Sequence, residues 1–210
     1  MIKIAFPDAW EELALVSVTK FAASPVAVQC AAITETIDIS EPDYPGESIP
    51  TLAGGRVWKQ SPQEDGEITL EIYPIQLATT ANNVGLFEQF VGGTFTSTES
   101  RSTDTSWPVG IQRARDRYRV TILWTNDTTP PATAEAQVAS GKEALRFSAM
   151  LCRIISHKTE FTDGVVKTTV TFKFPAMNKA GDVLAFRWDS CDATAVLAAL
   201  SSYDDEDSWT

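Results

Sequence analysis

The sequence predicts a mainly β fold: a β-sandwich or barrel with one flanking α-helix and long loops. Three observations support this prediction. Several segments alternate apolar and polar residues with the two-residue period of a strand. Clusters of Gly, Pro, Asp and Ser separate these segments, as expected for turns. Only one or two short segments have the spacing of an amphipathic helix.

The composition indicates a folded, acidic domain. The chain has 210 residues, of which 43% are hydrophobic and 10% aromatic, enough for a substantial core and unlike a disordered chain. Its formal net charge of −11 argues against binding to DNA or to an anionic membrane, since both partners favour a basic face. Residues 1–12 contain acidic side chains and do not resemble a secretory signal. The apolar run at 21–33 is too short to span a bilayer.

The first two segments are an arm and a strand. Residues 1–25 carry two prolines around a short apolar stretch, which favours an N-terminal arm or an edge strand. Residues 26–39 are predicted to form a long strand. Their apolar positions change parity near Ala31 and Ala32, which indicates a bulge or bend there.

A long loop is predicted at residues 40–55, where three prolines and three glycines interrupt regular structure. A loop of this length in a compact domain usually has a function. Its apolar side chains need a surface to pack on, so we expect it to dock on a partner. The residues assigned to this contact are Tyr44, Glu47, Ile49 and Leu52.

An antiparallel pair is predicted from 56–60 and 67–75, with a turn at 61–66. In the second strand, Ile68, Leu70 and Ile72 alternate with an acidic face that carries Glu67 and Glu71. A helix is predicted at 82–91, since an apolar stripe there ends at two glycines.

The C-terminal half contributes further strands. The predicted strands are 117–125, a hairpin of 145–161 and 165–174 around Asp163-Gly164, and 183–188. A short helix capped by Asp192 is predicted at 193–200. The expected domains are an N-terminal arm at 1–25, one β domain at 26–202 and an acidic disordered tail at 203–210.

No arrangement of residues predicts catalysis, a metal site or a cofactor. His157 is the single histidine and lies in no nucleophile motif. Cys30, Cys152 and Cys191 are far apart, which gives neither zinc spacing nor a disulfide framework and favours buried thiols. We therefore expect that the protein is not an enzyme and that it has no catalytic, cofactor-binding or metal-binding residues.

Charges are separated along the chain. Residues 35–71 hold nine acidic side chains against two basic ones, a net of −7. Residues 101–119 hold five arginines against two aspartates, a net of +3. This separation fits either a mixed soluble surface or pairing of acid with base between copies of the chain. The candidate basic interface consists of Arg113, Arg115, Arg117 and Arg119.

One stretch resembles a known family. It runs from Thr36-Ile-Asp-Ile-Ser, through Ile-Pro-Thr-Leu-Ala-Gly-Gly-Arg and Pro-Gln-Glu-Asp, to Glu-Ile-Thr-Leu-Glu-Ile-Tyr-Pro74. It is similar to the tail tube proteins, or major tail proteins, of tailed bacterial and archaeal viruses. The later hairpin at Phe161-Thr-Asp-Gly-Val-Val-Lys resembles the closing hairpin of that family.

The resemblance implies a structural subunit of the virion tail, made in the host cytoplasm. Such subunits close into rings, six in the family, by joining their sheets into a continuous inner barrel that also hides strand edges. The rings stack into a hollow tube, and a long loop contacts the next ring. Implied partners are other copies of the chain, the tape measure, the tail terminator and baseplate or tip proteins. DNA would pass through the lumen without specific binding, and Glu67 and Glu71 are candidates for its acidic lining.

Two other functions fit the sequence. One is another virion role, such as a tail terminator, a tail completion protein or a minor capsid protein. The other is a carbohydrate-binding β-sandwich, in which tryptophans stack on sugar rings. The tryptophans available for this are Trp58, Trp107, Trp124 and Trp188.

Overall fold

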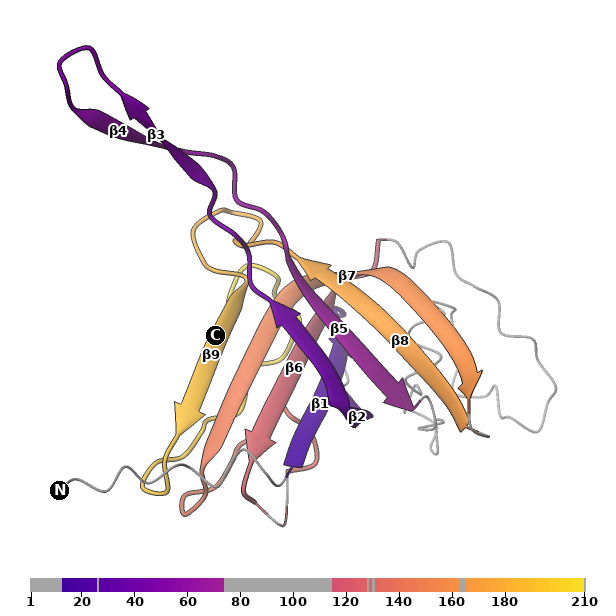
Figure 1. The fold of residues 1–210 in the computed structure, drawn as a ribbon. Coiled ribbons are helices and arrows are strands. Elements are labelled where there is room, and N and C mark those ends of the chain that lie inside the picture. The colour runs from indigo at the N-terminus through magenta and orange to yellow at the C-terminus, as the bar shows by residue number, and fades with distance from the viewer. Residues whose placement is uncertain are drawn as a thin grey trace, which may run out of the picture.

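The computed structural model describes residues 13–25, 27–73, 115–127, 129, 131–162 and 165–209. These residues form nine strands and no helix, which confirms the mainly β prediction (Figure 1). The predicted helix at 82–91 lies outside the described residues. The strands are β1 Leu13–Lys20, β2 Ala27–Ser40, β3 Gly46–Pro50, β4 Arg56–Gln60, β5 Gly66–Tyr73, β6 Tyr118–Thr125, β7 Ala144–Thr162, β8 Val165–Phe174 and β9 Phe186–Cys191.

Six strands close on themselves as a barrel. Their order is β6-β1-β2-β5-β8-β7, and an additional β6–β7 pairing joins the two ends. Strand β7 makes this possible because its first part pairs with β6 and its second part with β8. Strand β9 is added on the outer side of β7, while β3 and β4 form a separate two-stranded sheet. The barrel is thus closed within one chain by the β6–β7 pairing, whereas the family resemblance implied a barrel closed between copies.

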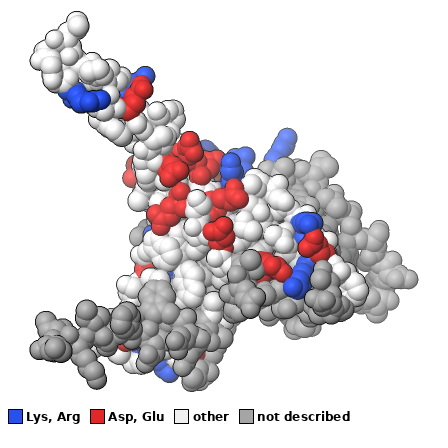
Figure 2. Space-filling view, viewed as in Figure 1, with Lys and Arg blue, Asp and Glu red and all other residues white. Residues whose placement is uncertain are grey.

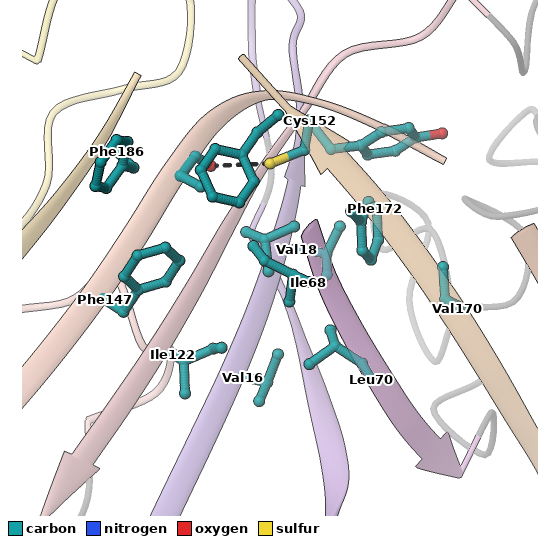
Figure 3. Close-up of a cluster of buried hydrophobic side chains, with 14 of the residues drawn as sticks. Val16, Val18, Ile68, Leu70, Ile122, Phe147, Cys152, Val170, Phe172 and Phe186 are labelled. Carbon is teal, nitrogen blue, oxygen red and sulfur yellow. Dashed lines mark hydrogen bonds between the residues drawn. The ribbon is translucent and has the colours of Figure 1, made fainter. Parts of the chain in front are cut away.

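Alternating strand residues fill the barrel with an apolar core. Val16, Val18, Ile68, Leu70 and Ile122 are fully buried and point toward one another from β1, β5 and β6 (Figure 3). Aromatic rings from β7, β8 and β9 complete it. The predicted alternation is confirmed at 67–72 and 167–174, where each buried position is two residues from the next.

A bulge bends β7 at the corner of the barrel. Tyr118 pairs with Cys152 but Val120 pairs with Ala149, so β7 holds one extra residue there. Leu151 at this bulge has a φ of 60°, a conformation that costs a branched residue energy. The Leu151 N–H donates to the hydroxyl of buried Tyr203 at 2.9 Å. This side chain thus supplies the acceptor for the N–H at the bulge.

Replacing Tyr203 by phenylalanine should lower the free energy of unfolding by about 1–3 kcal/mol, because the buried Leu151 N–H loses its acceptor. Urea denaturation measures this change. Tyr44→Phe is the matched control, since Tyr44 is 46% exposed and the same hydroxyl is removed from the surface. Equal stability of the Tyr203→Phe variant and the wild type would refute this account of the bulge.

Of two predictions for the N-terminal part, one is wrong and the other is confirmed. Residues 13–20 are no arm or edge strand, because β1 pairs with both β2 and β6 and buries Val16 and Val18 completely. The bulge predicted near Ala31 and Ala32 is confirmed by a register shift that begins after Ala32.

The predicted loop at 40–55 and the predicted 56–60 pairing are wrong. Residues 46–50 form β3 and pair with β4, from Gly46↔Gln60 to Pro50↔Arg56. The prolines and glycines do not prevent this, because Pro50 lies at the last position of a strand and Gly54, with a φ of 81°, lies in the turn. Strand β5 pairs with β2 and β8 instead.

Two predictions for the C-terminal part are also wrong. No helix forms at 193–200, because Asp192 accepts bonds from the Thr194 N–H and hydroxyl, and Leu197 then pairs with Val138 as an isolated bridge. The tail at 203–210 was expected to be disordered. Its described part packs on the sheet, with Tyr203 buried and the Trp209 Nε1 donating to the Leu184 carbonyl at 2.9 Å. The predicted β7–β8 hairpin is confirmed, while its turn residues 163 and 164 lie outside the described residues.

Candidate assembly interface

A projecting hairpin is the most distinctive surface of the molecule. Strands β3 and β4, with the turn between them, extend well beyond the barrel (Figure 1). We call residues 46–60 the arm. All of its residues are exposed except Gly46, which is half-buried. Because it lacks a covering layer, the arm presents both sheet faces to its surroundings.

Apolar side chains occupy both faces and the tip of the arm. Ile49 lies opposite Val57 on one face, where they are 40% and 56% exposed. Trp58, 64% exposed, lies opposite Ser48 on the other face. Leu52 at the tip is fully exposed. A two-stranded sheet is marginally stable alone in water, so a second surface that covered these groups would stabilise it.

Glycine at position 46 lets the Trp58 ring lie flat along the arm. A Cβ on Gly46 would lie 2.4 Å from the Trp58 Cζ2, closer than such atoms approach. Beside this ring, the Arg56 Nε donates to the Ser48 hydroxyl at 2.9 Å. The arm therefore has an aromatic plate flanked by a guanidinium group, a pair of groups common in protein interfaces.

Two short linkers join the arm to the barrel, and we call these residues, 41–45 and 61–65, the root. They bond to each other, from the Ser61 N–H to the Pro45 carbonyl at 2.8 Å and from the Glu64 N–H to the Asp43 carbonyl at 3.1 Å. Acidic side chains gather where the arm meets the barrel (Figure 2). The exposed acids of the root are Glu41, Asp43, Glu64 and Asp65.

The four residues assigned to the docking loop are all exposed, and they are spread along the root and the arm. Glu47, Ile49 and Leu52 are on the arm, and Tyr44 is on the root. Val57 and Trp58 also belong to this surface and were not predicted to do so. The signal was present, because pairing residues 46–50 with 56–60 would have placed these two side chains opposite Ile49 and Ser48.

The strand face assigned to an acidic lumen carries mixed charge. Glu71 forms an ion pair with Lys167 at 3.4 Å, and both side chains are partly buried. Glu67 lies opposite Lys173 across the β5–β8 pairing. The lysines come from β8, so the acidic pattern of β5 alone does not describe the charge of this face.

The candidate basic interface is only partly on the surface. Arg113 lies outside the described residues, Arg115 is exposed, and Arg117 donates from its guanidinium to the Arg115 carbonyl. Including Arg119 was wrong, because its side chain is 3% exposed and pairs with Glu135 at 2.6 Å. A side chain committed to this buried pair does not form an outer contact.

A buried polar layer surrounds that pair on the outer face of the sheet. Arg119 donates to both carboxylate oxygens of Glu135 and to the Ser201 carbonyl. Arg146 donates to Asp189 at 3.1 Å and to the Ala198 carbonyl at 2.9 Å. Burial lowers the pKa of Arg146, and Asp189 opposes that shift. Both arginines thus hold the C-terminal segment against the sheet.

The described residues offer little for catalysis. They contain no group of three His, Cys, Asp or Glu side chains placed to hold a metal ion. Burial raises the pKa of the Cys152 thiol far above its usual range, which makes this side chain a poor nucleophile. Within the same residues, no helix is long and apolar enough to cross a membrane.

The tryptophans within the described residues do not form a row of exposed rings on which sugars could stack. Trp124 and Trp188 stack on each other with centroids 6.0 Å apart, and Trp107 lies outside the described residues. Trp58 alone stands on the arm, away from the barrel. This arrangement gives the carbohydrate-binding alternative no specific support.

Comparison with protein-family models and with curated proteins found no match. Similar solved structures include chains of an extracellular contractile injection system and of the anti-feeding prophage. One chain, from an extracellular contractile injection system described as PVC sheath/tube terminator in extended state, has 11% identity and a TM-score of 0.45, covering 91% of this chain and 100% of that one. A chain of the PVC sheath-tube complex has 9% identity and a TM-score of 0.47, covering 90% and 95%. A chain of the anti-feeding prophage baseplate has 11% identity and a TM-score of 0.46, covering 90% and 97%. Similarity at this level does not assign a function.

Proposed function

We propose that this protein is a structural subunit of a phage-tail-like particle and that it assembles with its own copies through the arm. The projecting hairpin carries the proposal. It exposes Ile49, Leu52, Val57 and Trp58 on a two-stranded sheet that lacks a core of its own. Apolar groups held this far from the barrel gain nothing from intramolecular packing, so their burial requires another molecule.

The proposed contact is between unlike surfaces. The proposal is that the arm docks on another region of the neighbouring copy and not on that copy's arm. Contacts between unlike surfaces generate closed rings or open filaments, depending on the rotation between copies. Ring formation and stacking are the two steps by which a tail is built from one kind of subunit.

Two roles in such a particle would both use this contact between neighbouring copies. A tube subunit polymerises into stacked rings, whereas a terminator stops at one ring. The proposed partners are other copies of the chain, the tape measure, the terminator and the baseplate or tip. Glu67 and Glu71 stay proposed as groups of a lumen through which DNA passes, with Lys167 and Lys173 beside them.

The direct experiment is sedimentation velocity and negative-stain electron microscopy of the full chain over a concentration series. Hollow tubes of uniform diameter are expected for a tube subunit, and single rings for a terminator. Particles that stay monomeric at every concentration, also when mixed with isolated tails, would contradict the proposal.

Replacing Leu52 by aspartate should weaken self-association at least tenfold. Burial of a leucine side chain contributes about 1.5–3 kcal/mol, and each 1.4 kcal/mol is a factor of ten in affinity. Sedimentation velocity measures the shift of the association midpoint. Val196→Asp is the matched control, because Val196 is an apolar side chain, 49% exposed, outside the arm. Equal effects of the two substitutions would show that charge, rather than the arm, weakens association.

A further inference from the structure

The direction of the arm depends on how the root is held. Strand β2 enters the root after Ser40, and strand β5 leaves it at Gly66. Both ends of the root are fixed by packing, since Pro42 is buried and a Cβ on Gly66 would lie 2.3 Å from the Phe174 Cζ. Between these ends, the two backbone hydrogen bonds described above join one linker of the root to the other. A hairpin attached in this way can pivot as a unit.

One side-chain hydrogen bond joins the root to strand β9. The Trp188 Nε1 on β9 donates to the Glu41 Oε1 at 2.6 Å. It joins the root directly to β9, the strand that lies beside β7. Its acceptor is a carboxylate, and hydrogen bonds to charged groups are stronger than neutral ones.

The donor side of this bond is held rigidly. The Trp188 ring stacks on Trp124 with centroids 6.0 Å apart and an interplanar angle of 18°. It also contacts Phe147, with centroids 4.8 Å apart. Phe147 in turn packs on Phe174, the ring that covers Gly66. The same aromatic cluster therefore contacts both ends of the root.

We infer that Trp188 and Glu41 are positioning residues that fix the direction of the arm before it meets a neighbouring copy. A small rotation at the root becomes a large displacement at the tip, because each strand residue adds about 3.3 Å of length. When the direction of the arm is already fixed in the free subunit, association does not have to restrict its motion, and the entropy cost of binding is smaller. The effect of this bond on assembly rests on the proposed function. Its effect on the direction of the arm in the free subunit does not.

The test measures the arm in the free subunit. Spin labels on unnatural amino acids at positions 52 and 129 report the distance from the arm tip to an exposed point on the barrel, at concentrations where the protein is monomeric. We expect a narrow distance distribution for the wild type and one at least twice as broad for Trp188→Phe, which keeps an aromatic ring but loses the N–H. Glu41→Ala should broaden it equally, and Glu41→Gln, which keeps an acceptor oxygen, should restore most of the narrow distribution.

Trp58→Phe is the control, because it changes a tryptophan on the arm and leaves the root unaltered. Distributions of equal width for Trp188→Phe and the wild type would overturn the inference. So would equal broadening by Glu41→Gln and Glu41→Ala, since removal of the acceptor would then not be the cause. Self-association about tenfold weaker in Trp188→Phe is expected as the second readout. A wild type that never associates would contradict the proposed function, and the distance measurement alone would then decide this inference.

Discussion

Replacing Glu135 by alanine is expected to lower the free energy of unfolding by about 3–5 kcal/mol, the cost of leaving a buried charge without its partner. The Arg119 side chain is 3% exposed and donates to both oxygens of this carboxylate. The Thr19 hydroxyl donates to it as well, at 2.6 Å. The alanine variant removes all three acceptor contacts while Arg119 stays away from water. Chemical denaturation with guanidinium chloride measures the loss.

Glu160→Ala is the matched control for this substitution. Glu160 pairs with Lys158, but both side chains are about half exposed or more, and surface ion pairs contribute roughly 0–1 kcal/mol. We expect the control to remain within that range of the wild type. If Glu135→Ala lowered the free energy of unfolding by no more than the control does, the buried pair would not hold the C-terminal segment as described.

Replacing the arm, residues 46–60, by a short Gly-Ser turn is expected to abolish self-association and to leave the barrel folded. The arm contributes no residue to the buried clusters, so the free energy of unfolding should change by no more than about 0.5 kcal/mol. An armless subunit still offers the surface on which a neighbour's arm docks. Added to the wild type in small amounts, it should therefore stop growth and shorten the assemblies.

Mixing series followed by negative-stain microscopy measure this effect through the length distribution of the particles. A variant that keeps the arm strands but replaces the turn residues 52–54 by Asp-Gly-Asn is the control for loss of the tip alone. Assemblies of normal length formed by the armless subunit would show that the arm is not the docking element.

Strands with strict alternation could be predicted from the sequence. Ile68, Leu70 and Ile72 of β5 are all fully buried, and the polar residues between them are not, as a two-residue period requires. The β7–β8 hairpin followed from the Asp163-Gly164 turn signal for the same local reason. Local patterns suffice where each strand has one buried face.

Long-range pairing could not be predicted in this way. Ser17 and Thr19 are buried in β1 although they are polar, because a second layer covers that face of the sheet and supplies partners such as the Ala134 N–H. Residues 13–20 therefore resemble an exposed arm in the sequence. The burial of Arg119 was missed for the same reason, since its partner Glu135 lies 16 residues away and outside every predicted strand.

Docking through residues 40–55 stays a prediction, and the structure predicted for this segment was wrong. Its prolines and glycines indicated a loop, and the cross-strand pairs that make it a hairpin depend on register, which the composition of 40–55 does not show. Tyr203 and Trp209 were likewise hidden within an acidic tail, although an aromatic residue beside a run of charges is a signal that the tail packs on the sheet.

The most direct test of the central claim is site-specific photo-crosslinking from the arm tip. A photoreactive amino acid at position 52, in the full chain at assembling concentrations, should crosslink one copy to another, and mass spectrometry should locate the second site outside the arm. The same group at Thr194, exposed on the barrel side of the molecule, is the control and should give far fewer crosslinks between copies. Oligomers that form while position 52 gives no crosslink between copies would contradict assembly through the arm.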